Sequence, residues 1–443
     1  MRTGTRAFWK SADTRTFWVP VVALAAISTV DPFIRLGSVR FAQLSGFQDD
    51  FFYYLTIARN LAEHGRSTFD GVSLTNGYHP LWEAVLTLLA RLAPAGSVTF
   101  VALLMSVVFG LILLSAVLMR RMALSTWPDA PVSVDLGSLI FVFACAQLAR
   151  TGMETVIAIP AILAALVSVL ACADAPSPRR YFVAAVCCSL AVLSRIDAAI
   201  FVALLVTIAL AFGAKHRVVP AAQDAFKPRI LASIALGALP LVGYIAVNYA
   251  IFGTLIPQSG AAKQIRSSAS INGRVWEFLL APRKTPSEFV YFFLVGTMPF
   301  VLAVAGCTRV AIRHVPPRAR IVMLSLGGFT LVYYAVLSVI SDWSLWIWYL
   351  YPAATAGGPG AVLLFSSLES RLPRRLPQLT AIALVLIAAA GVMGRRPASN
   401  RILGLGVQIA EFATTHRAGT RWVTWREPRA SCCRRGWCRW KAS

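Results

Sequence analysis

The chain has 443 residues, of which 57% are hydrophobic and only 14% are charged. Soluble domains carry roughly 25% charged residues, so a water-soluble protein of this length could not cover its surface with so few charges. Apolar runs recur from Trp18 almost to Met393. The sequence therefore predicts one polytopic membrane domain, not several soluble domains.

The excess of basic residues gives a formal charge of +23, which in a soluble protein would indicate a nucleic-acid partner. Here the basic residues gather in short clusters between apolar runs, as in loops that stay on the cytoplasmic side of a membrane. The clusters are Arg2/Arg6/Lys10/Arg15, Arg120/Arg121, Arg179/Arg180, Lys215/Arg217/Lys227/Arg229, Arg313/Arg318/Arg320 and Arg371/Arg374/Arg375. We expect membrane lipids as partners, and no nucleic acid.

The apolar runs predict an all-α, polytopic transmembrane helical bundle with about eleven crossings, at ~20 residues per crossing. The expected spans are 17–37, 98–119, 134–150, 154–172, 181–194, 197–213, 230–252, 288–311, 321–340, 345–366 and 376–394. The apolar segment 81–93 is too short to cross, and we interpret it as re-entrant or interfacial.

The basic clusters test this placement of segment 81–93. With the amino terminus in the cytoplasm and no crossing at 81–93, every cluster falls on the cytoplasmic side, whereas a crossing would move all but the first to the outside. The first apolar run lacks a convincing cleavage site, so we expect it to stay as a helix. Segment 38–97 and the carboxyl-terminal tail are then external.

The first external segment holds two adjacent acids, Asp49 and Asp50, before an amphipathic pattern that Gly65 ends. This pattern predicts an interfacial helix with both carboxylates at its amino terminus. One acid would suffice for capping. Two acids beside a bilayer repel each other, which favours a general base, an anchor for an acceptor hydroxyl, or a cation site.

Two turn dipeptides follow, Asp70-Gly71 and Asn76-Gly77, so we expect the loop to fold back and return His79 and Trp82 to the membrane surface. Trp82 is an ordinary interfacial anchor. For His79 two interpretations stay open, a proton carrier and a structural histidine before Pro80.

Several motifs resemble the GT-C superfamily, polytopic bacterial glycosyltransferases that take sugars from polyprenyl-phosphate carriers. The first external loop carries a DDxFYY-like start (Asp49, Asp50, Phe52, Tyr53), the sequence ARNLAEHG and the sequence TNGYHPLW. Further matches are TGMET (151–155), LSRIDA (193–198) and NYAIFGTLIPQSGAAK (248–263). The resemblance covers roughly residues 15–394 and implies a GT-C-like domain over 1–394, with 38–97 as its external catalytic loop.

The resemblance implies an enzyme of the bacterial cytoplasmic (plasma) membrane. It would move a hexosyl or pentosyl group from a polyprenyl-phosphate carrier to a glycan, lipid or protein acceptor of the cell envelope, with inversion. We predict Asp49 as the base and Asp50 as its partner. The predicted substrate-binding residues are Tyr53, Asn76, His79, Glu154, Arg195 and Lys263. No cofactor is certain, and a divalent cation (Mg²⁺, Mn²⁺ or Ca²⁺) on Asp49, Asp50 and Glu154 stays open.

The residues of the later motifs also have interpretations of their own. Glu154, at the edge of an apolar run, should face a wet cavity or a cation, or else stabilise the next helix start. Arg195 and Asp197 could simply pair with each other. Lys263 is an external cation, so it calls for an anionic partner, either a lipid-carrier phosphate or a phospholipid headgroup. The aromatic residues of 341–352 indicate an interfacial belt, with stacking on a sugar as the alternative.

Two other functions stay in consideration. A multi-pass transporter or lipid-carrier flippase would also place charges within the membrane, but we expect repeat symmetry in such a protein, and the acidic loop occurs once. A non-catalytic membrane scaffold would not explain the paired acids.

The short external tail, 395–443, changes composition near its end. Cys432, Cys433 and Cys438 match no zinc spacing. Reverse translation from His416, read one base earlier, can give the more ordinary sequence PGRYAMGDLAG, which indicates a shifted reading frame. We expect the residues after about 416 to be unpacked and without function.

Overall fold

The computed structural model describes residues 13–34, 47–216, 228–255, 257–258, 271–280, 286–342 and 344–393. The chain divides into two units, Met1–Arg396 and Pro397–Ser443, and every described residue belongs to the first. The predictions for the tail therefore lie outside the described residues.

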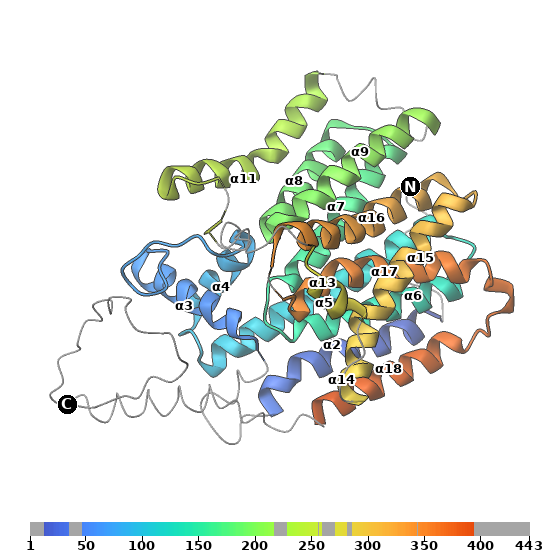
Figure 1. The fold of residues 1–443 in the computed structure, drawn as a ribbon, viewed down its shortest axis with the longest axis horizontal. Helices are drawn as coiled ribbons and strands as arrows, with labels where there is room; N and C mark the ends of the chain where they lie inside the picture. The colour runs from blue at the N-terminus through green and yellow to red at the C-terminus, as the bar shows by residue number, and fades with distance from the viewer. Residues whose placement is uncertain are drawn as a thin grey trace. The chain divides into compact units, whose positions relative to one another are not determined.

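The described part of the chain is built from helices, and its one β contact is an isolated bridge between Thr68 and Leu74. The elements are α2 (Asp13–Ile34), α3 (Asp49–His64), α4 (Pro80–Leu92), α5 (Val98–Thr126), α6 (Pro131–Ala149), α7 (Thr155–Asp174), α8 (Pro178–Ser194), η2 (Ile196–Ala198), α9 (Ala199–His216), α11 (Pro228–Phe252), α13 (Arg274–Leu280), α14 (Pro286–Phe292), η3 (Phe293–Thr297), α15 (Met298–Ile312), α16 (Pro317–Ile340), η4 (Ile347–Leu350), α17 (Tyr351–Ser366), η5 (Glu369–Arg371) and α18 (Leu376–Met393). Figure 1 shows their arrangement.

Proline and serine mark many helix starts. Proline occupies the first turn of α4, α6, α8 and α16, where its missing N–H costs no helical hydrogen bond. The Ser97 and Ser177 side chains cap α5 and α8 by accepting hydrogen bonds from the N–H groups of Phe100 and Arg180. Because these caps bound long apolar runs, the helix positions follow from local sequence.

Each of the eleven expected spans contains one or more helices among its described residues. Among the described residues, six helices are long and apolar enough to cross a membrane: Val98–Thr126, Pro131–Ala149, Thr155–Asp174, Pro228–Phe252, Glu288–Ile312 and Pro317–Ile340. Three shorter apolar helices, Thr16–Val30, Ile196–Phe212 and Leu376–Val392, fall in three more expected spans. The all-α membrane architecture is confirmed, and the number of eleven crossings stays a prediction.

Small residues bring α6, α15 and α17 close together. A Cβ atom added to Gly137 of α6 would lie only 2.6 Å from the carbonyl oxygen of Gly358 in α17. A Cβ atom on Gly357 would likewise lie 2.6 Å from the Cα atom of Pro299 in α15. Small residues allow such close backbone packing between membrane helices. This packing buries α17 almost completely and fixes its first residue, Tyr351, beside the site described below.

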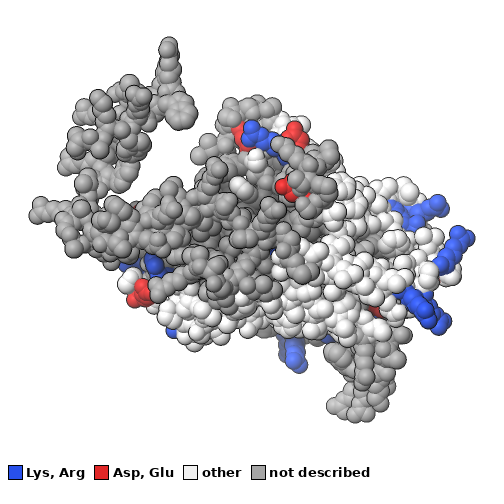
Figure 2. Space-filling model, turned by 90° about the horizontal axis from the view of Figure 1, so that it is seen from below, with Lys and Arg blue, Asp and Glu red and all other residues white. Residues whose placement is uncertain are grey.

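The loops that carry basic residues meet at one end of the bundle. The Glu369 carboxylate accepts hydrogen bonds from the N–H groups of Val132 and Ser133, at 2.7 and 3.0 Å, which joins η5 to the start of α6. Arg318 of α16 donates to Asp174 of α7 at 2.7 Å. Figure 2 shows basic side chains projecting from the right-hand end, where the loop between α17 and α18 lies in Figure 1. The positive-inside rule predicts a cytoplasmic location for this end.

Helices α3 and α4 pack together at the other end (Figure 1). With 13 residues, α4 is too short to span a bilayer core of ~30 Å at 1.5 Å per residue. Its last residue, Leu92, lies just before the start of α5, which runs from this end toward the basic loops. Both ends of α4 therefore lie at the same end of the bundle, in agreement with the prediction for 81–93.

Candidate functional site

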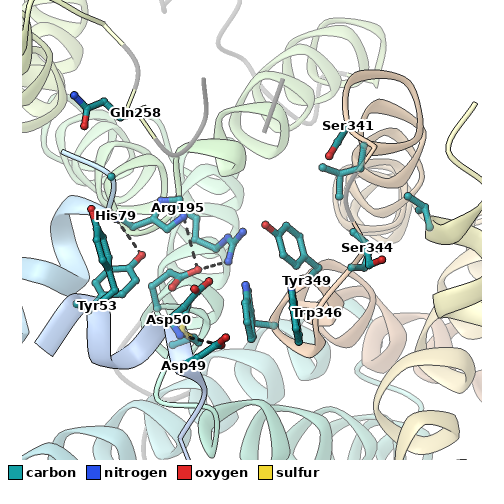
Figure 3. Close-up of a pocket in the computed structure, with 18 of the residues that line it drawn as sticks. Asp49, Asp50, Tyr53, His79, Arg195, Gln258, Ser341, Ser344, Trp346 and Tyr349 are labelled. Atoms are coloured by element: carbon teal, nitrogen blue, oxygen red, sulfur yellow. Dashed lines mark hydrogen bonds and ion pairs between the residues drawn. The ribbon is translucent and has the colours of Figure 1, made fainter. Parts of the chain in front are cut away.

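A pocket of about 510 Å³ lies beside α3 and the start of α4. This size falls within the range of small-molecule sites, ~300–1,000 Å³. Figure 3 shows side chains entering it from two directions: Asp49, Asp50 and Tyr53 from α3, and Trp346 and Tyr349 from the segment between α16 and α17. One wall is thus acidic and the opposite wall is aromatic.

The corner between α6 and α7 fixes the start of α3. The N–H group of Gln48 donates to the carbonyl oxygen of Thr151 at 3.1 Å. The indole Nε1 of Trp82 in α4 donates to the carbonyl oxygen of Gly152, also at 3.1 Å. Because Glu154 follows in the same corner, these bonds bring the α3 acids and Glu154 to one pocket.

Gly152 makes this corner possible. Its φ is +74°, which an L side chain rarely adopts. A Cβ atom at this position would lie 2.6 Å from the Phe47 ring and 2.9 Å from the Phe51 ring. Glycine therefore supplies both the backbone conformation and the space into which the first turn of α3 packs.

Asp49 and Asp50 occupy the first turn of α3, and both are exposed. Gln48 holds the N-cap position, so neither acid is the N-cap residue. The Asp49 carboxylate accepts a hydrogen bond from the N–H group of Asp50 at 3.0 Å. The helix amino terminus stabilises both negative charges, which remain on the pocket wall.

Tyr53 lies one helical turn further along the same wall. Its hydroxyl pairs with the Thr75 hydroxyl at 2.8 Å, and its ring stacks on Phe69 with centroids 5.0 Å apart. Burial raises the pKa of Tyr53. The hydroxyl therefore stays protonated at neutral pH and can donate a hydrogen bond.

His79 immediately precedes α4 and connects three parts of the site. Its backbone N–H donates to the Tyr54 hydroxyl at 3.2 Å, and its Nδ1 accepts from the N–H group of Ile196 at 3.3 Å. Nε2 lies 3.7 Å from Glu154 Oε1. Since Nδ1 accepts a hydrogen bond, a neutral His79 carries its proton on Nε2, on the side of Glu154.

Arg195 forms the centre of a buried ion network. Its Nε and Nη2 atoms donate to the two carboxylate oxygens of Asp197 at 3.0 and 2.7 Å, and its Nη1 donates to Glu154 Oε1. The guanidinium also lies over the rings of Tyr351 and Tyr349, at 4.6 and 5.5 Å from their centroids. The expected pairing of Arg195 with Asp197 is therefore present, and it includes Glu154 as well.

This network limits what Arg195 can do for a ligand. Its side chain is 3% exposed, and two carboxylates share its positive charge. Among the lining residues that the structure describes, Arg195 is the one Lys or Arg, against three acids. The described wall is thus acidic overall, and an anionic ligand would need further cations.

The aromatic wall begins with two parallel indole rings. Trp346 stacks on Trp348 with centroids 5.6 Å apart and an angle of 3° between the planes. Trp348 is buried, whereas Trp346 is 48% exposed. Ser341 and Ser344, from the same segment, add polar residues to the pocket lining.

Hydrogen bonds hold the aromatic wall at both ends. Asn272 donates from its side chain to the carbonyl oxygen of Ser341 at 2.8 Å, and the Tyr334 hydroxyl donates to the carbonyl oxygen of Tyr349 at 3.0 Å. The segment that carries Trp346 is therefore fastened to α16 and to the residues before α13.

The structure brings six predicted site residues to this one pocket. They are Asp49, Asp50, Tyr53, His79, Glu154 and Arg195. Their catalytic and binding roles stay predictions. Lys263 lies outside the described residues.

Asn76 does not occupy the place that a substrate-binding residue would need. It is 1% exposed, and its amide donates to Asn248 at 2.9 Å and accepts from the N–H group of Gln258 at 2.9 Å. We therefore correct its assignment. Asn76 fastens the first external loop to the end of α11 and does not line the pocket.

A metal site on Asp49, Asp50 and Glu154 gains no support from the arrangement of these side chains. Within the described ranges, no three His, Cys, Asp or Glu side chains are grouped so as to hold a metal ion. Glu154 is instead engaged by Arg195 and His79. Binding of a divalent cation by the α3 carboxylates together with ligand oxygens stays a prediction.

The tyrosines that complete the ion network were not predicted from the sequence. The hydroxyls of Tyr351 and Tyr333 donate to the Asp197 carboxylate at 2.8 and 3.2 Å. One available signal was their position within apolar runs, because a buried hydroxyl there needs a partner. The sequence does not say which partner it is.

Comparisons with known proteins place the fold. No family model and no curated protein matches the sequence. The structure is similar to the crystal structure of ArnT from Cupriavidus metallidurans bound to undecaprenyl phosphate, with a TM-score of 0.51 and 14% sequence identity. The chain has a GT-C-like fold. The structural match covers 83% of this chain and 63% of the ArnT chain. This chain therefore spans less than two thirds of the length of ArnT.

Proposed function

We propose that this protein is a membrane glycosyltransferase. It moves a sugar from a polyprenyl-phosphate carrier to a cell-envelope acceptor at the outer face of the cytoplasmic membrane. The observation that carries the proposal is the pair of exposed carboxylates, Asp49 and Asp50, on a pocket wall within a GT-C-like fold. The ArnT structure, bound to undecaprenyl phosphate, supports a lipid carrier of this class.

In the proposed reaction, Asp49 accepts the proton of an acceptor hydroxyl as the acceptor oxygen bonds to the anomeric carbon. The bond between that carbon and the phosphate oxygen breaks, and the polyprenyl phosphate leaves with the electron pair. A single displacement of this kind inverts the anomeric centre. Asp50 holds the acceptor or raises the basicity of its neighbour, and positioned proton transfer is worth ~10²–10⁴-fold in rate.

The departing phosphate needs positive charge nearby, and charges in a site closed to water act more strongly. Arg195 reaches the pocket, but Glu154 and Asp197 share its charge. We therefore assign the larger part of this role to Lys263, with hydrogen-bond donation from His79 Nε2 as a further contribution.

The test is sugar transfer by Asp49→Asn and Asp50→Asn in lipid nanodiscs. Mass spectrometry of lipid carriers and envelope glycans from cells that lack the gene would first supply the donor and acceptor. We expect turnover to fall ~10²–10⁴-fold in the variant that lacks the base, with unfolding unchanged. Glu63→Gln is the matched control, because Glu63 is an exposed acid at the other end of α3. Normal turnover in both Asp variants would refute the proposal.

Two further assays separate the alternatives. Passage of an unmodified solute or lipid carrier across proteoliposomes, without transfer, would favour a transporter. Loss of transfer in EDTA, restored by Mg²⁺, Mn²⁺ or Ca²⁺, would assign a cation to the α3 carboxylates.

A further inference from the structure

The exposed indole of Trp346 is placed unlike that of an ordinary interfacial tryptophan. In a belt, the ring lies among lipid headgroups on the outside of the protein. Trp346 instead lines a pocket that also contains Asp49 and Asp50 (Figure 3). It thus presents a flat apolar surface opposite two carboxylates.

The chemistry of this arrangement matches a sugar ring. A sugar ring has an apolar face of C–H bonds, which packs on an aromatic ring, and a rim of hydroxyls, which needs hydrogen-bond partners. Trp346 supplies the aromatic face, and Ser344 is a polar residue of the same pocket segment. A bare hydrocarbon chain would pack on the indole but could form no hydrogen bond with the polar lining of the pocket.

Contacts within the protein also hold the segment that carries Trp346 in place without a ligand. The Trp348 ring stacks on the Trp346 ring. Hydrogen bonds from Asn272 to Ser341 and from Tyr334 to Tyr349 hold the segment before and after Trp346. A preorganised surface loses little conformational entropy on binding, which favours recognition of a small ring.

The position within the pocket distinguishes acceptor from donor. A donor phosphate must lie near cations, and Arg195, the one Lys or Arg among the described lining residues, is bound by Glu154 and Asp197. Figure 3 shows Trp346 and Ser344 across the pocket from Asp49 and Asp50. A sugar ring between the two walls can therefore present a hydroxyl to the proposed base, as an acceptor must.

We propose that Trp346, with Ser344, forms a subsite for a sugar ring of the acceptor. The acceptor is then a glycan or a glycosylated lipid, and not a bare lipid or an unglycosylated peptide. The role of this ring as the acceptor rests on the proposed function, whereas binding of a sugar ring at Trp346 does not.

The test measures binding without any donor. Methyl glycosides, including methyl α-D-mannopyranoside and methyl α-D-arabinofuranoside, are titrated into the protein in nanodiscs and followed by saturation-transfer NMR. We expect saturation of ring C–H protons in the wild type, binding about tenfold weaker in Trp346→Ala, and most binding kept in Trp346→Phe. Phe289→Ala is the matched control, because Phe289 is 49% exposed and stacked on Phe293 but does not line the pocket.

Two results would overturn the subsite. One is the absence of binding by every glycoside, or equal binding by the wild type and Trp346→Ala. The other comes from vesicles of brominated lipid: a large loss of quenching in Trp346→Phe relative to the wild type would place this indole among lipids, as a belt predicts.

Transfer kinetics separate this proposal from the proposed function. If the subsite is present in a working transferase, Trp346→Ala raises the acceptor KM about tenfold and changes kcat less. Glycoside binding that depends on Trp346, with normal turnover in both Asp variants, would uphold the subsite and refute the proposed catalysis. Turnover that depends on Asp49 or Asp50, with an unchanged acceptor KM in Trp346→Ala, would uphold the proposed catalysis and refute the subsite.

Discussion

Two groups of carboxylates lie at the same end of the molecule in opposite surroundings. Asp49 and Asp50 are exposed at the amino terminus of α3. Glu154 is 2% exposed and Asp197 is 27% exposed, and both are bound to Arg195. The first group keeps its charge at little cost because water and the helix terminus stabilise it, so it is available to a ligand. The second group is neutralised within the protein and holds the pocket in shape.

The largest effect should come from removing the centre of the buried group. Arg195→Met leaves Glu154 and Asp197 without their shared cation, which should lower the free energy of unfolding by ~3–5 kcal/mol. Thermal unfolding in detergent measures this loss. Arg318→Met is the matched control, since Arg318 and its partner Asp174 are 27% and 48% exposed and such pairs contribute only ~0–1 kcal/mol. Equal losses in the two variants would contradict the comparison.

A smaller effect should follow from disturbing the corner that joins the two groups. Gly152→Ala adds a Cβ atom at positive φ against the Phe47 and Phe51 rings, at a cost of ~1–3 kcal/mol. The first turn of α3 should shift, so transfer activity should fall more than protein yield. Gly110→Ala in α5 meets no atom within 4 Å and should leave activity and unfolding temperature unchanged. Wild-type activity in Gly152→Ala would show that the corner does not position the acids.

The smallest effect concerns a third kind of acid, Glu83 in α4. Neither carboxylate oxygen has a hydrogen-bond partner among the described residues, and burial raises the pKa of Glu83 well above 4.5. The folded protein therefore retains a proton that the unfolded chain releases. The resulting stability is fully present below the unfolded pKa and is lost as the pH rises through the folded pKa.

Glu83→Gln removes this titration, so its free energy of unfolding should vary less with pH than that of the wild type above about pH 5. At lower pH the two proteins should unfold at similar temperatures, because the side chains differ little in shape. Unfolding followed from acid to neutral pH tests the prediction. Parallel profiles would show that Glu83 is already ionised in the folded state.

The sequence predicted the parts of the site that depend on residues close together in the chain. Local signals were reliable: α3 begins at Asp49 and ends before Gly65, whose φ is +66°, and α4 is a short helix. The Asp70-Gly71 dipeptide forms the expected turn, in which Asp70 accepts hydrogen bonds from the N–H groups of Val72 and Ser73. Each of these features depends on residues a few positions apart.

Long-range contacts could not be predicted in this way. Asn76-Gly77 is the same kind of dipeptide as Asp70-Gly71, but the Asn76 side chain turns inward to Asn248, 172 residues away. Arg195 binds Glu154 across 41 residues, and Asp197 binds Tyr351 across 154. Apolar periodicity reports which face of a helix is buried, and it does not report which distant side chain lies against it.

The two walls of the pocket have a consequence for biosynthesis. The α3 acids are synthesised early, whereas Trp346 lies late in the chain, between α16 and α17. A nascent or truncated chain that stops before α17 thus presents the acids without the opposite face. The proposed chemistry would therefore require the insertion of nearly all the helices.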